Sequence, residues 1–248
     1  MKLQSEKVRS KCIDQLFNDW SQLGIRLTHS DKRKEVDIEM VIVNTTYLGR
    51  YNSRLLFSML TWIRDNADLI NSQKLINTLS DADISVLGAI LAIALKNGAD
   101  KKLVAVKNHC KKKIKPEILF ANMKKNPLLY EQEVSESCKE WKEWGLYCSE
   151  ISFYNDARYD REYILRNNKL LAIRALFGSN LRAEILYMLF KKSNMYIRLL
   201  SKTTGFSYFP VQMEVKNLLL NGLLNSVSYG RTNVLSLSSN AKKILTCV

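Results

Sequence analysis

Residues 175–237 read ALFGSNLRAEILYMLFKKSNMYIRLLSKTTGFSYFPVQMEVKNLLLNGLLNSVSYGRTNVLSL, and the order of the patterns in this stretch predicts its fold. Three segments carry apolar residues at helical spacing, and the first and third of them follow a residue that can cap a helix. They are 181–189, 195–203 and 208–219. Residues 223–228 and 233–237 follow as two strands joined by a turn. The stretch therefore predicts three helices and then a two-stranded hairpin.

The third of these helices has the clearest pattern. Val211, Val215, Leu218 and Leu219 fall at positions i, i+4, i+7 and i+8, which places them on one face. Ser207 is expected to cap the helix, and Pro210 in its first turn suits a helix start. We therefore expect these four apolar residues to form the face of the helix that packs in the core.

Residues 177–237 resemble the winged helix-turn-helix of ArsR/MarR-type transcription regulators. The resemblance rests on the F-G-S-x-x-R opening at 177–182, the L-x-x-x-T-G-x-S turn at 200–207 and the Gly230-Arg231 tip of the hairpin. It implies DNA binding, with the third helix in the major groove and the wing against the DNA backbone or the minor groove.

The resemblance also implies which residues contact double-stranded DNA. They lie on the second helix, on the third helix and at the wing tip. They are Lys202, Ser207, Tyr208, Gln212, Lys216 and Arg231.

The third helix departs from the family on the face opposite its core. That face carries Phe209, Met213, Lys216, Asn217 and Leu220, whereas the family commonly has Arg or Lys at the position of Met213. Exposed apolar strips are typical of protein interfaces. An alternative function is therefore open: an adaptor whose winged helix mediates dimerisation or partner docking through Phe209, Met213 and Leu220.

The charge supports a polyanionic partner. The chain of 248 residues carries a formal net charge of +14. Residues 101–125 hold nine basic residues against one acidic residue, and residues 176–248 hold nine against two. The first stretch is either a second phosphate-binding patch or a solvated lysine-rich face. The patch residues are Lys101, Lys102, Lys111, Lys112, Lys113 and Lys115.

The remainder of the chain predicts a helical N-terminal domain over 1–174, of unknown role, before the winged helix and basic tail at 175–248. The chain contains only three Pro and nine Gly residues, and such low numbers favour helices over a turn-rich β protein. The fold class is mainly α. Residues 36–43 are expected to form a short strand or an extended arm. Further helices are expected at 50–66, 71–79, 83–97, 99–113, 116–124, 127–147 and 159–176.

No motif predicts an enzyme. Asp37 and Glu39 resemble the metal-holding carboxylates of nucleotidyltransferases, but no Gly-Ser step precedes them. His109, Cys110, Cys138 and Cys148 lack zinc-ligand spacing. We therefore expect no catalytic residues, no metal and no cofactor.

The ends and the cysteines favour a cytoplasmic protein. The first residues show no secretory signal, and the five cysteines are scattered and odd in number. The apolar run 84–95 is too short to span a bilayer and predicts a buried core helix.

Overall fold

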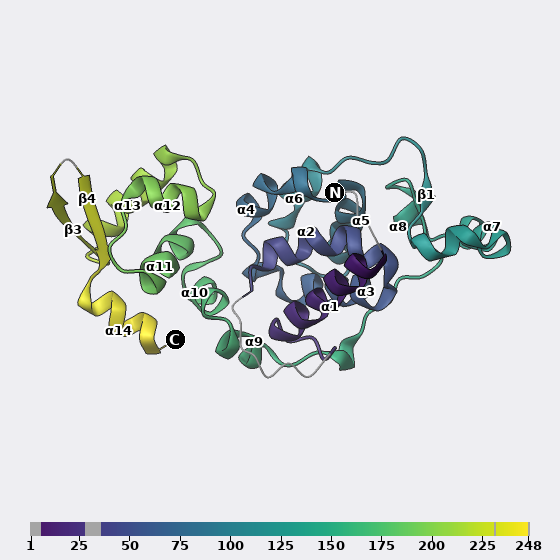
Figure 1. Ribbon diagram of the computed structural model, residues 1–248, viewed down its shortest axis with the longest axis horizontal. Helices are drawn as coiled ribbons and strands as arrows, with labels where there is room; N and C mark the ends of the chain where they lie inside the picture. The colour runs from purple at the N-terminus through teal and green to yellow at the C-terminus, as the bar shows by residue number, and fades with distance from the viewer. Residues whose placement is uncertain (1–5, 28–35, 231, 248) are drawn as a thin grey trace. The chain divides into compact units, whose positions relative to one another are not determined.

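The structure, a computed structural model, describes residues 6–27, 36–230 and 232–247. It divides into two compact units, residues 1–167 and 168–248 (Figure 1). The expected boundary was residue 174. Helix α10 (Lys169–Phe177) packs on α11 (Leu181–Lys191), which is why the second unit begins earlier.

The N-terminal unit is mainly helical. Its α-helices are α1 (Glu6–Gln22), α2 (Ile38–Leu48), α3 (Ser53–Asn66), α4 (Ser72–Asn77), α5 (Ile84–Lys96), α6 (Leu103–His109), α7 (Pro127–Glu136), α8 (Lys139–Lys142) and α9 (Arg161–Asn167). Two short strands, β1 (Glu117–Ile118) and β2 (Leu146–Tyr147), pair in parallel. Short 3₁₀ turns, including η1 (Gly49–Tyr51) and η4 (Ala121–Lys125), connect several of these elements.

Helix α5 forms the middle of this unit, as the apolar run predicts. Asp83 caps it, because the Asp83 side chain accepts a hydrogen bond from the backbone N–H of Val86. Helices α2, α3 and α6 all pack against it. Gly88 of α5 lies under the indole of Trp144, so closely that a Cβ there would meet the ring at 2.1 Å.

Buried tryptophans join α1 to the same core. The indole N–H of Trp20 donates to the Thr45 hydroxyl of α2 at 3.0 Å. The indole N–H of Trp62 in α3 donates to the carbonyl of Leu23 at 2.8 Å. Both rings are buried, and their polar atoms are satisfied within the fold.

The expected strand at 36–43 is wrong, because these residues begin helix α2. The Asp37 side chain accepts a hydrogen bond from the N–H of Met40, which caps the helix. Ile38, Val41 and Ile42 are all buried. The run is apolar on nearly every side because α2 is covered by α1, α3 and α5, and such burial erases the helical periodicity.

The helix expected at 116–124 is also wrong, and the one expected at 127–147 is broken. Residues 116–124 contain β1 and part of η4, while α7 and α8 are separate helices before β2. Gly145 has φ +70°, and a Cβ there would lie 2.6 Å from the Lys113 carbonyl oxygen. The chain turns at this glycine and pairs with the 113–119 segment instead of continuing as a helix.

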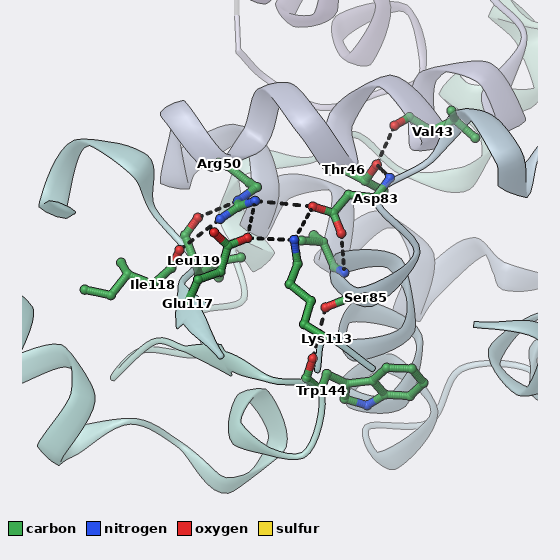
Figure 2. Close-up of polar contacts among 11 residues, drawn as sticks. Val43, Thr46, Arg50, Asp83, Ser85, Lys113, Glu117, Ile118, Leu119 and Trp144 are labelled. Atoms are coloured by element: carbon green, nitrogen blue, oxygen red, sulfur yellow. Dashed lines mark hydrogen bonds and ion pairs between the residues drawn. The ribbon is translucent and has the colours of Figure 1, made fainter. Parts of the chain in front are cut away.

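An ion-pair network attaches that segment to the core (Figure 2). The Arg50 guanidinium donates to the carbonyls of Leu119 at 2.9 Å and Ile118 at 3.0 Å. It also pairs with Asp83 at 3.3 Å and with Glu117 at 2.8 Å. Strand β1 is thereby held against η1 and the start of α5.

The C-terminal unit contains α10 to α13, a hairpin and a final helix. After α10 and α11 come α12 (Ile197–Thr204), α13 (Tyr208–Leu220), β3 (Leu224–Tyr229), β4 (Thr232–Leu237) and α14 (Ser239–Cys247). The expected three helices and antiparallel hairpin are confirmed. The basic tail forms α14, whose Leu245 is buried in the core of this unit.

A buried ion pair joins α10 to α11. The Arg174 guanidinium contacts the Glu184 carboxylate at 2.5 Å and 2.9 Å, and both side chains are almost fully buried. Arg174 therefore serves the core of the C-terminal unit.

Within the described residues, no helix combines the length and the apolar character needed to cross a bilayer.

We expect Gly88→Ala to destabilise the N-terminal unit by about 1–3 kcal/mol, because its methyl group collides with Trp144. At a helix position with space for the methyl group, replacing Gly by Ala stabilises the helix by about 1 kcal/mol. Urea unfolding followed by tryptophan fluorescence measures this, since all four tryptophans precede residue 168. In a Trp144→Leu background the penalty should shrink. A stabilised Gly88→Ala single variant would contradict the packing.

We expect Arg174→Met to destabilise the C-terminal unit by about 3–5 kcal/mol, because it leaves the buried Glu184 carboxylate without this cation. The double variant Arg174→Met/Glu184→Leu should recover most of that loss. Hydrogen exchange of the α10 and α11 amides measures the change locally. Unaltered protection in the single variant would rule out a stabilising pair.

Candidate nucleic-acid interface

The turn between α12 and α13 is specified locally. Helix α12 ends at Gly205, which adopts a left-handed conformation with φ +74°. The Ser201 hydroxyl then donates to the Phe206 carbonyl at 2.7 Å. Ser207 occupies the N-cap position of α13 as expected, but its side chain makes no capping hydrogen bond. The turn sets α13 against α12 and leaves the Ser207 side chain exposed.

A short backbone bridge fixes the start of α12 beside the hairpin. The N–H of Met195 donates to the Leu235 carbonyl at 3.0 Å, and the N–H of Leu235 donates to the Met195 carbonyl at 2.7 Å. Both side chains are buried. Met195 thus adds a third, one-residue strand position next to β4. The apolar spacing of residues 195–203 predicts a helix that includes residue 195, so this pairing is not predicted from the sequence.

An open cleft of about 630 Å³ lies between the first turns of α12 and α13 and strand β4. Its lining is aromatic, polar and basic. The lining residues are Tyr196, Ile197, Arg198, Tyr208, Gln212, Thr232 and Asn233. A cleft with this lining offers donors and one positive charge to a phosphate backbone.

Of the described residues expected to contact DNA, the cleft brings together Tyr208 and Gln212. It adds Arg198, which sequence analysis does not name. Arg198 lies four residues before Lys202, so both occupy one face of α12, and that spacing was the available signal.

The other expected residues that the structure describes, Lys202, Ser207 and Lys216, lie outside the cleft lining. Lys202 and Lys216 are exposed. Arg231, expected at the wing tip, lies outside the described residues. Glu214, the acidic residue of α13, pairs with Arg182 at 2.6 Å, so its charge is partly neutralised.

The apolar residues on the outer side of α13 are exposed within this chain. Phe209 is 68% exposed, Met213 45% and Leu220 76%. Nothing among the described residues buries them, and they remain available to a partner.

The expected second basic patch is only partly a free surface. The Lys102 ammonium donates to the Asp68 carbonyl at 2.6 Å. The Lys113 ammonium contacts Asp83 at 3.2 Å and Glu117 at 2.6 Å, as Figure 2 shows. Both lysines therefore have structural roles. The exposed members of the patch are Lys101, Lys111, Lys112 and Lys115.

A shallow cleft of about 620 Å³ lies along residues 111–115, but carboxylates share it. Asp83 and Glu117 line it together with the lysines. Both carboxylates are ion-paired with Arg50 and Lys113, so Lys113 is engaged within the fold. The C-terminal unit gathers an arginine with aromatic and amide side chains in one cleft, and we therefore place the candidate nucleic-acid interface there.

The structure does not bring the side chains of His109, Cys110, Cys138 and Cys148 together as a set of zinc ligands. Cys138 and Cys148 approach each other, since the N–H of Cys138 donates to the Cys148 carbonyl at 2.8 Å. The Cys110 thiol contacts the Val106 carbonyl of its own helix instead. Among the residues that the structure describes, no group of three or more His, Cys, Asp or Glu side chains is arranged to hold a metal ion.

Asp37 and Glu39 likewise have structural roles. Asp37 caps α2, and the buried Glu39 carboxylate accepts from the N–H of Asn71 at 2.8 Å. The Lys74 ammonium contacts both carboxylates, at 2.7 Å and 3.2 Å.

Comparison with protein-family models, with curated proteins and with solved structures finds no match for this chain. The resemblance of residues 177–237 to winged-helix regulators therefore stays a prediction.

We expect Cys110 and Cys148 to resist alkylation, because burial raises the pKa of each thiol to about 12. At pH 8 a thiol with that pKa is a thiolate in about one molecule in ten thousand. Timed iodoacetamide labelling with mass spectrometry should therefore modify the exposed Cys247 first. Unfolded protein, in which all thiols are accessible, is the control. Equal rates for Cys148 and Cys247 in the folded protein would contradict the burial.

Proposed function

We propose that the C-terminal unit is a winged helix-turn-helix that binds double-stranded DNA, and that the protein acts as a transcriptional regulator. The observation that carries this proposal is the cleft between α12, α13 and β4. It gathers Arg198, Tyr208 and Gln212 beside the hairpin. The order of three helices and a hairpin, with Met195 bridged to β4, supports the same fold.

In this proposal α13 enters the major groove and the hairpin follows the DNA backbone. Arg198 and Tyr208 contact phosphate from the cleft, and Lys202 and Lys216 contact it from the exposed sides of their helices. The nine basic residues of 176–248 against two acidic ones supply the attraction. The N-terminal unit senses a signal, dimerises or binds a partner protein.

A second candidate function is protein docking. The observation that favours it is the exposure of Phe209, Met213 and Leu220 on one side of α13. In that case the C-terminal unit binds a protein, or a second copy of this chain, through the apolar side of α13.

Fluorescence anisotropy with a labelled random duplex, across a salt series, tests DNA binding. We expect affinity to fall steeply with salt, because bound lysines and arginines release counterions. Arg198→Ala should reduce the slope of log affinity against log salt by about one, since it removes one phosphate contact.

Lys139→Ala is the matched control for this measurement. It removes the same charge from the N-terminal unit, where the Lys139 side chain is 86% exposed. Its salt slope should equal that of the wild type. Absence of binding at low salt, or equal slopes in the two variants, would reject DNA binding through the cleft. Self-association that Phe209→Ser abolishes would favour docking.

A further inference from the structure

The first two turns of α13 carry side chains with a restricted chemistry. The helix reads YFPVQMEVKNLLL and contains no arginine. The exposed residues among its first six positions are Tyr208, Phe209, Pro210, Gln212 and Met213. Val211 between them is fully buried and belongs to the core. Whatever α13 contacts with its first half, it contacts with one amide and four largely apolar groups.

These groups match only part of the code that base pairs present in the major groove. Guanine is recognised there chiefly by Arg or Lys, which donate to its O6 and N7 atoms. Adenine is recognised by the amide of Gln or Asn, and the thymine methyl group by apolar side chains. The first half of α13 offers contacts to adenine and to the thymine methyl group, but it offers no Arg or Lys to guanine.

The two polar residues further along α13 do not alter this match. Lys216 comes after the first two turns and bears a single flexible charge, which suits a phosphate. The Asn217 amide donates to the Glu214 carboxylate at 3.4 Å, and Glu214 is held by Arg182. Asn217 is therefore directed along its own helix.

We infer that the protein recognises A·T base pairs, with Gln212 contacting adenine and with Met213 and Phe209 packing on thymine methyl groups. The inference rests on the proposed function, since it requires α13 in the major groove. It explains the departure from the family at Met213: the apolar residue takes the place of a guanine contact. It also gives the exposed apolar residues in the first half of α13, Phe209 and Met213, a DNA partner.

The exposure of these side chains fits the assignment. Met213 is 45% exposed and Phe209 is 68% exposed, so each has apolar area left to bury. A methyl group removed from water contributes about fourfold in affinity. A thymine-to-uracil replacement deletes that methyl group and leaves the hydrogen-bonding pattern of the base pair unchanged.

The test uses the full chain and three labelled duplexes of equal length. The first contains A·T pairs, the second has uracil in place of every thymine, and the third contains G·C pairs. We expect the A·T duplex to bind at least about tenfold more tightly than the G·C duplex. Uracil replacement should weaken binding by about fourfold for each methyl group contacted.

Variants of α13 connect the preference to named side chains. Met213→Ala should reduce the thymine-to-uracil affinity ratio toward one, because the partner of the methyl group is gone. Gln212→Ala should weaken binding to both A·T duplexes equally. Leu220→Ala is the matched control: it removes an apolar side chain that is 76% exposed at the other end of the helix. It should leave the ratio unchanged.

The possible failures are distinguishable. Equal, salt-dependent affinity for the A·T and G·C duplexes overturns the inference and leaves DNA binding in place. An A·T preference that survives uracil replacement, Met213→Ala and Gln212→Ala also overturns it, since that preference comes from DNA shape. No binding to any duplex at low salt overturns the proposed function together with the inference.

Discussion

Two backbone hydrogen bonds between Met195 and Leu235 determine the geometry of the candidate interface. They join Met195, two residues before α12, to the second strand of the hairpin, and the two buried side chains enter the same core. The first turn of α12 is therefore fixed beside β4. The turn at Gly205 then sets α13 on the other side of the cleft. The bridge thus places Arg198 of α12 beside Asn233 of β4, and the packing of α13 on α12 adds Tyr208 to the same cleft.

A comparable constraint organises the N-terminal unit, and it changes how the charge of the chain is interpreted. Arg50 and Lys113 both pair with Asp83 and Glu117, and Arg50 also binds the carbonyls of residues 118 and 119. This network holds an irregular segment against the helical core. Part of the positive charge that stands out in residues 101–125 therefore serves the fold.

The C-terminal unit shows a different distribution of charge and apolar surface. Its acidic residues are both paired: Glu184 with Arg174 inside the core, and Glu214 with Arg182 beside α13. The exposed basic residues are consequently not opposed by them. The apolar residues on the outer side of α13 are exposed within the part of the chain that the structure describes. Positive charge together with exposed apolar groups suits the phosphates and the methyl-bearing bases of DNA, while the apolar groups alone suit a protein.

The sequence by itself determined the elements whose signals are local. The three helices, the hairpin and α5 follow from periodicity, from capping residues such as Asp83 and Asn180, and from turns at Gly205 and Gly230, because each of these acts within a few residues. Tertiary structure alone decided the helical state of residues 38–48, the pairing of β1 with β2, the bridge at Met195 and the roles of Lys102 and Lys113. In those cases the partners are distant in the chain. A helix that is buried on every side has no periodic apolar pattern in its sequence. A contact with one distant carboxylate or carbonyl leaves no pattern near the residue, so neither can be predicted from the sequence.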